Sequence, residues 1–139
     1  MCLTVDKEFK TRQEVRDFFA KPLITKTNKV VYKVLERFGP IYNSPYQNMD
    51  YKLGELKTVP KFGVIIGKSF FRTVWDMDIE RGIHACTTLY RARQIVNNGS
   101  FRVIVRCYIP KGTPYFIGNY NDIVSLALQM PKEFKHIYL

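Results

Sequence analysis

The stretch FRVIVRCYI, residues 101–109, decides the fold class of this chain. Its side chains alternate between two faces with the period of a β-strand. One face is expected to comprise Phe101, Val103, Val105, Cys107 and Ile109. The other face would carry Arg102, Ile104, Arg106 and Tyr108. A strand with an apolar face needs neighbouring strands to bury it, so the stretch predicts a sheet.

The residues just upstream predict a second strand and a helix. The apolar run IHAC, residues 83–86, is predicted to be a short buried strand. Residues 88–98 repeat apolar side chains at helical spacing, and the run Asn97-Asn98-Gly99 is typical of the end of a helix. A strand and a helix therefore precede the strand at 101–109.

The remaining segments are short elements separated by turns. Residues 11–21 predict a helix with Thr11 as its N-cap. Residues 29–36, 73–79 and 123–129 predict strands, and residues 38–48, rich in Pro, Gly and Asn, predict a loop. Many strands, two short helices and no repeated strand–helix–strand rhythm predict an α+β protein. We expect a single domain over residues 1–139 with a mainly antiparallel twisted sheet.

Composition excludes several classes of protein. The chain has 139 residues, the size of one ordinary domain, and its 46% of hydrophobic residues can supply a core. No apolar run approaches the roughly 20 residues that span a bilayer, and the N-terminus lacks the apolar stretch of a secretory signal. Its 3 cysteines have no metal-binding spacing, which favours reduced thiols. We therefore expect a cytoplasmic protein without a membrane segment, metal site or cofactor.

The net charge of +10 is the strongest compositional signal. Residues 81–139 carry 8 Lys and Arg against 2 acids, whereas residues 34–80 carry 6 of each. A field of this sign attracts anions such as nucleotides, nucleic acid or an acidic protein surface. Charge that serves only solubility is the alternative.

The stretch GIHACTTLYRAR, residues 82–93, is the first candidate ligand site. A helix that starts near Thr87 or Thr88 has free N–H groups at its first turn, and no acid occupies that turn. Free amides, hydroxyl groups and Arg91 together favour a bound phosphate, with His84 nearby. A helix capped by threonine for structural reasons is the alternative. Under either interpretation, an acid placed at position 91 is expected to be neutral or mildly stabilising for the fold.

Two further candidates lie outside this stretch. Arg102 and Arg106 share a strand face with Tyr108, and that face could hold phosphates and stack a base. We expect this face and the 82–93 turn to form one main pocket, with Lys33 nearby. Ordinary surface arginines are the alternative. A tyrosine-rich loop carries Tyr42, Tyr46 and Tyr51 and is predicted to line a pocket or an interface. Because aromatic residues are so frequent, we also expect a homo-oligomer.

Signatures of catalysis are missing from the sequence. There is no phosphate-binding P-loop, no GxGxxG run, no HExxH run and no pair of carboxylates at catalytic spacing. The C-terminal half offers few acids for general acid–base chemistry. These observations favour a binding protein over an enzyme.

Several segments resemble small, mostly uncharacterised proteins of bacteriophages and prophages. They are the start MCL, VYKVLE, SPYQNMDYKLGE, GIHACTTLYRA and YIPKGTPYFIGNYNDIVS. The resemblance implies a small accessory protein. Accessory phage proteins of this size are often counter-defence factors, some of which trap nucleotide immune signals while others bind a defence protein directly.

The chain also shows a fainter similarity to the ADP-ribosyltransferase fold. The segments VYKVL and GIHACTTLYRA would make Lys33 and His84 the counterparts of residues in that family. The family's late catalytic glutamate has no evident counterpart, and Asp122 is the nearest acid. The leading hypothesis is therefore a counter-defence protein that sequesters an anionic, nucleotide-like signal. The alternatives are an NAD-using enzyme of ADP-ribosyltransferase type, a basic nucleic-acid-binding module and a direct inhibitor of a host defence protein.

Overall fold

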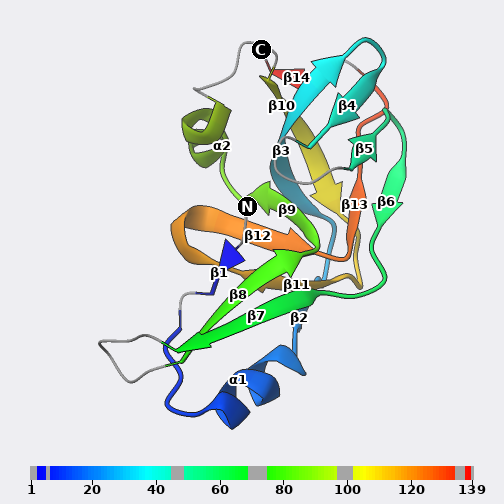
Figure 1. The fold of residues 1–139 in the computed structure, drawn as a ribbon. Coiled ribbons are helices and arrows are strands. Elements are labelled where there is room, and N and C mark those ends of the chain that lie inside the picture. The colour runs from blue at the N-terminus through cyan, green and yellow to red at the C-terminus, as the bar shows by residue number, and fades with distance from the viewer. Residues whose placement is uncertain are drawn as a thin grey trace.

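A computed structural model describes residues 3–5, 7–44, 49–68, 75–96, 102–133 and 137–138. Its helices are α1 (Arg12–Phe19), α2 (Leu89–Val96) and the short 3-10 helix η1 (Asn119–Asn121). Its strands are β1 (Leu3–Thr4), β2 (Leu23–Ile24), β3 (Lys29–Phe38), β4 (Ile41–Asn43), β5 (Asp50–Tyr51), β6 (Leu56–Thr58), β7 (Gly63–Lys68), β8 (Trp75–Arg81), β9 (Ile83–Cys86), β10 (Arg102–Ile109), β11 (Pro114–Ile117), β12 (Asp122–Ser125), β13 (Ala127–Gln129) and β14 (Ile137–Tyr138). Figure 1 shows these elements.

The α+β class predicted from the sequence is confirmed. The larger sheet has the strand order β2-β11-β12-β9-β3-β10-β13-β6, and β4, β5 and β14 pair at its side. The smaller sheet has the order β1-β8-β7. Each strand pair in the described part of the chain is antiparallel. No helix in the same part has the length and apolar character needed to cross a bilayer.

The strand at residues 101–109 has the alternation that the sequence predicts. It forms β10 and pairs with β3 along its whole length, from Arg102 opposite Glu36 to Ile109 opposite Lys29. Val103, Val105, Cys107 and Ile109 are all buried in one cluster. Phe101 lies outside the described residues. This strand pair is therefore the centre of the larger sheet.

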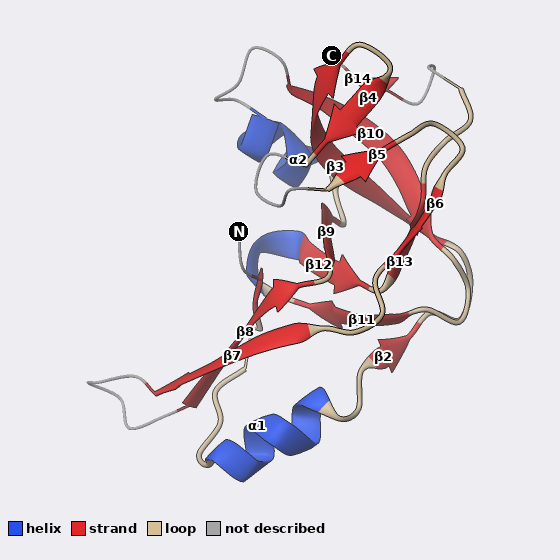
Figure 2. Cartoon of the chain, turned by 45° about the vertical axis from the view of Figure 1, so that its right-hand side comes forward, coloured by secondary structure: helices blue, strands red, loops and turns tan. Residues whose placement is uncertain are grey.

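Within the described residues, three apolar clusters hold the elements together. The largest lies on the inner face of β3 and β10 and includes Tyr42 and Tyr51 from β4 and β5. The second joins α1 and the smaller sheet to Phe116 and Val124 of the larger sheet. The third lies beneath α2, where Ala92 packs with Val34 and Ile104. Figures 1 and 2 both show β3 and β10 between α2 on one side and β4, β5 and β6 on the other.

The helix α1 begins as the sequence predicts. The Thr11 hydroxyl accepts a hydrogen bond from the Glu14 N–H at 3.2 Å, and the Glu14 carboxylate accepts one from the Lys10 N–H at 2.9 Å. Val15 is fully buried on the face toward the second cluster. The first bond satisfies an N–H group that a helix start leaves without a partner, and the second ties the Glu14 carboxylate to the residue before the N-cap.

Two predicted segments differ from the structure. Residues 38–48 were expected to form a loop, but β3 runs to Phe38 and β4 returns from Ile41, because pairing these strands buries the Tyr42 ring. Residues 123–129 were expected to form one strand. The chain instead leaves β12, which pairs with β9 and β11, and enters β13, which pairs with β10 and β6. The break lies at Leu126 and lets the sheet turn around its core.

Candidate functional site

The start of α2 is tied to a hairpin turn. The Thr88 hydroxyl accepts a hydrogen bond from the Arg91 N–H at 3.2 Å, as an N-cap does. The N–H and the hydroxyl of Thr87 both donate to the carbonyl of Asn121, at 2.8 and 3.1 Å. The two threonines singled out in the sequence therefore serve the helix and its contact with the β11–β12 turn.

The side chain of Arg91 also meets this turn. Its Nε donates to Asp122 Oδ1 at 3.0 Å and its second terminal nitrogen donates to Asp122 Oδ2 at 3.3 Å. This hydrogen bond raises the pKa of the Arg91 guanidinium. The guanidinium carbon lies 5.5 Å from the centroid of the Tyr120 ring. The acid that the first turn of α2 lacks in sequence is thus supplied from β12.

His84 lies in β9, three residues before Thr87, and its imidazole ring is neutral. Burial, followed by the nearby charge of Lys33, lowers the pKa of its ring to about 4. The ring nitrogen Nε2 lies 3.3 Å from the carbonyl of Glu80. The backbone carbonyl of His84 accepts a hydrogen bond from Lys33 Nζ. His84 therefore carries no charge near neutral pH.

Lys33 lies inside the core rather than on an open pocket wall. Its side chain points inward from β3, the residue is only 3% exposed, and burial lowers the pKa of its ammonium to about 8. The ammonium lies 5.5 Å from the centroid of the Tyr51 ring, and Lys57 lies at the same distance from that ring. Two cations therefore contact one buried aromatic ring.

Of the three tyrosines predicted to line a pocket or an interface, two lie in the core and the third lies outside the described residues. Tyr42 and Tyr51 oppose each other across β4 and β5, and both are buried. Their hydroxyl groups have no hydrogen-bond partner among the described residues. Tyr46 lies outside the described residues. Burial raises the pKa of the Tyr51 hydroxyl, so it stays protonated.

The helix α2 covers part of the outer face of β10 and leaves the rest of that face exposed. Ile104 is buried beneath the helix. Arg102 lies 3.7 Å from the Glu36 carboxylate and donates to the Ile95 carbonyl at 3.4 Å. Arg106 and Tyr108, beyond the helix, are exposed. The predicted face therefore separates into one arginine engaged with the protein and one exposed arginine beside a tyrosine.

Among the hollows on the surface of the described residues, the following three are each lined by two cations. The Arg37–Lys52 hollow has a volume of about 700 Å³ and is lined by Arg37, Gly39, Pro40, Ile41, Tyr42, Lys52 and Leu53. A second hollow, of about 640 Å³, is lined by Met49, Lys57, Thr58, Val59, Pro60, Glu80, Arg81 and Gly82. A third, of about 300 Å³, is lined by Val30, Arg106, Cys107, Tyr108, Pro131 and Lys132. The 82–93 turn and the Arg102/Arg106 face do not line a common hollow among these three.

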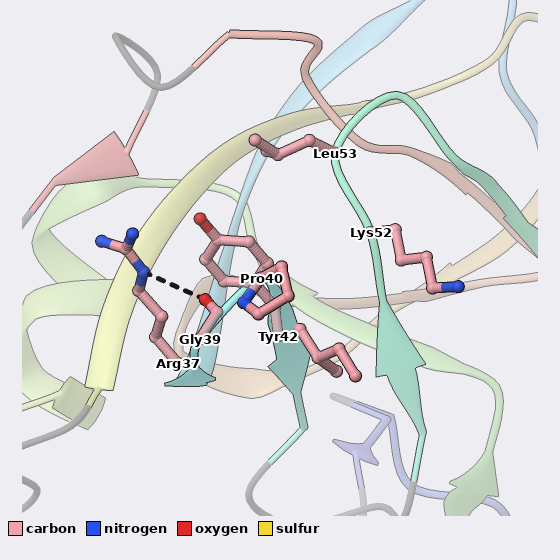
Figure 3. A pocket seen from close by; sticks show the side chains of 7 residues that line it. Arg37, Gly39, Pro40, Tyr42, Lys52 and Leu53 are labelled. Carbon is pink, nitrogen blue, oxygen red and sulfur yellow. Dashed lines mark hydrogen bonds between the residues drawn. The ribbon is translucent and has the colours of Figure 1, made fainter.

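The Arg37–Lys52 hollow is built by the turn between β3 and β4. The Arg37 Nε donates to the Gly39 carbonyl at 3.5 Å, so the arginine folds back over the turn. Figure 3 shows Arg37 on one side of the Tyr42 ring and Lys52 on the other. The described residues that line this hollow include no acid. Sequence reasoning missed Arg37 and Lys52, although both flank the Pro- and Tyr-rich segment that it singled out.

No protein-family model matches the chain, and neither a curated protein nor a solved structure matches it. The geometry of the site therefore has to carry any functional argument.

Proposed function

We propose that the protein binds a nucleotide-like anion in the Arg37–Lys52 hollow and acts as a phage-type counter-defence factor that sequesters it. The supporting observation is the lining of this hollow, which combines two cations and an aromatic ring with apolar side chains and no described acid. Its volume of about 700 Å³ lies within the range of small-molecule sites. The role in counter-defence rests on the resemblance to phage accessory proteins.

The lining residues match the parts of a nucleotide. A guanidinium such as that of Arg37 can bind a phosphate through two parallel hydrogen bonds, and the Lys52 ammonium can bind a second charged oxygen. Pro40, Ile41 and Leu53 offer apolar surface to a base or a sugar. Tyr42 closes the floor of the hollow but is almost fully buried, so the polar contacts are expected from Arg37 and Lys52.

The charge of the whole chain supports an anionic ligand. A net charge of +10 raises the local concentration of anions around every hollow. The field alone does not choose between a free nucleotide and a longer polyanion. The limited volume of the hollow favours the smaller ligand.

An NAD-using transferase has less support. Lys33 and His84 come together, but through the backbone carbonyl of His84, and Lys33 is almost fully buried. Asp122, the acid nearest to the missing glutamate in the sequence, is held by Arg91. Analysis of NAD after incubation with the protein would expose transferase or hydrolase products if this alternative holds.

Calorimetric titration with a panel of mononucleotides, dinucleotides and cyclic dinucleotides tests the proposal. At least one of them should bind with clearly higher affinity than inorganic phosphate. Arg37→Gln and Lys52→Gln should each weaken that binding by about tenfold or more, because each removes a charge-assisted hydrogen bond. Lys10→Gln, a change of the same charge at an exposed site beside α1, is the matched control. Unchanged affinity in both hollow variants, or no binding across the panel, would overturn the proposal.

A further inference from the structure

The turn between β11 and β12 has an unusual residue at its centre. The Asp122 N–H donates to the Asn119 carbonyl, and the two residues between them, Tyr120 and Asn121, have positive φ angles of 60° and 64°. This is the pattern of a type I′ hairpin turn, which prefers Asn, Asp or Gly at both central positions. A bulky aromatic residue is strained in this backbone conformation.

Burial does not compensate for this strain. Tyr120 is 76% exposed. The ring contact described for it is with the Arg91 guanidinium, at 5.5 Å. A residue that strains the backbone and buries little apolar surface is a candidate for contact with a molecule outside the chain.

A second exposed tyrosine lies on the neighbouring helix. Tyr90 is 73% exposed and immediately precedes Arg91, the residue that contacts the Tyr120 ring. Tyr90 and Tyr120 are the two most exposed large apolar side chains among the described residues. The bonds from Thr87 to Asn121 and from Arg91 to Asp122 join the start of α2, which carries Tyr90, to the turn that carries Tyr120. We call these two joined segments with their exposed tyrosines the Tyr90–Tyr120 platform.

The platform is held rigid by contacts already described. Thr87 donates two hydrogen bonds to the Asn121 carbonyl, and Arg91 binds both carboxylate oxygens of Asp122. These bonds fix the turn against the start of α2. A ring presented on a fixed backbone loses little conformational freedom when it binds a partner.

The positive charge of the chain favours an anionic partner. Residues 81–139, which provide both tyrosines, carry 8 basic and 2 acidic side chains, and one of those acids, Asp122, is paired with Arg91. Arg93 is exposed on α2. Exposed aromatic rings on a positively charged protein are features that bind single-stranded nucleic acid. A second copy of the chain would bring another charge of +10 to the same surface and is disfavoured.

We propose that the Tyr90–Tyr120 platform stacks the bases of single-stranded nucleic acid while Arg93, exposed on the same helix as Tyr90, binds a phosphate. This proposal does not depend on the Arg37–Lys52 hollow, which lies at the β3–β4 turn.

Fluorescence anisotropy with labelled oligomers of deoxythymidine and of uridine, about 15 nucleotides long, tests the platform. Tyr120→Asn suits the type I′ turn better than the native residue, and Tyr90→Gln keeps a good helix former, so both variants should stay folded. Each should weaken binding of the oligomers about fivefold or more, as expected for loss of one stacked base. The slope of affinity against salt should not change, because neither substitution removes a charge.

Tyr108→Gln is the matched control, since it removes an exposed tyrosine at the third hollow. It should leave the affinity within about twofold of the native protein. Equal losses at all three tyrosines would show diffuse attraction and overturn the proposal, as would native affinity in both platform variants. Binding of poly-L-glutamate without binding of either oligomer would also overturn it and would point to an acidic protein partner. A stronger affinity for the uridine or the deoxythymidine oligomer decides between RNA and DNA.

Discussion

The guanidinium of Arg91 binds both carboxylate oxygens of Asp122, with 3.0 Å between Nε and Oδ1. The two side chains are mostly buried between the start of α2 and β12. This ion pair joins α2 to the first residue of β12, at the end of the β11–β12 turn. It therefore links two segments that are 31 residues apart in the chain.

Reversing the charge at Arg91 tests this link. On the sequence alone, Arg91→Glu was expected to be neutral or mildly stabilising. In the structure, the new carboxylate would face Asp122, so the free energy of unfolding should fall by about 2 kcal/mol. Urea unfolding measures the change. The double variant Arg91→Glu with Asp122→Arg should recover at least part of the loss, and a loss that the second change deepens would contradict the pairing.

The buried ammonium of Lys33 should make stability rise with pH. Its pKa is about 8 in the folded protein, against about 10.5 in the unfolded chain, so the unfolded chain binds more protons between these values. The folded state is therefore favoured increasingly as the pH rises through that window, by about 3 kcal/mol in all. The raised pKa values of the Cys86 and Cys107 thiols act in the opposite direction above about pH 9.

The contribution of Lys33 is therefore measured as the difference in unfolding free energy between the native protein and a variant without the ammonium. Unfolding free energies of the native protein and of Lys33→Met are compared from about pH 8 to about pH 10.5. The native protein should gain stability relative to the variant across this range. A constant difference between the two proteins would show that Lys33 titrates normally in the fold. Lys10→Met, an exposed change of the same kind, controls for the loss of one charge.

The neutral ring of His84 should make the protein less stable in mild acid. Because the folded protein binds a proton at His84 only near pH 4, and the unfolded chain does so near pH 6.5, acid favours the unfolded chain between these values. The loss should reach up to about 3 kcal/mol. NMR titration of the ring gives the folded pKa directly. A ring pKa near 6.5, or the same acid dependence in His84→Gln, would contradict this prediction.

Local patterns in the sequence were enough to predict much of the fold. The alternation at residues 101–109 identified β10, and Thr11 with Glu14 identified the start of α1, because both signals lie within a few residues. The strand break at Leu126 was missed, since the choice of partner strands is made across the sheet. Apolar residues on both sides of Leu126 fit one strand as well as two.

Less of the candidate site than of the fold could be predicted from the sequence. The pairing of Arg91 with Asp122 and the burial of Lys33 depend on contacts between distant segments. The Arg37–Lys52 hollow exists because β3 and β4 form a hairpin where a loop was expected. The positive φ of Tyr120 runs against the preference of its residue type, so no propensity could have indicated it.

At Gly82, which begins the stretch GIHACTTLYRAR, a single added methyl group should destabilise the fold. It has a φ angle of +148°, and an added Cβ would lie 2.5 Å from Val124 Cγ2 and 3.2 Å from the Phe62 ring. Gly82→Ala should therefore lower the free energy of unfolding by about 2–4 kcal/mol through backbone strain and overpacking together. Gly112→Ala separates the two effects, because Gly112 also has a positive φ, of +84°, but nothing lies within 4 Å of its added Cβ. That control should cost only about 1 kcal/mol.

Adding Val124→Ala to Gly82→Ala should cost less than the sum of the two single changes, since it removes the atom in closest contact. Thermal and urea unfolding of the four variants measure these terms, and equal losses at Gly82 and Gly112 would show that the contact with Val124 contributes nothing.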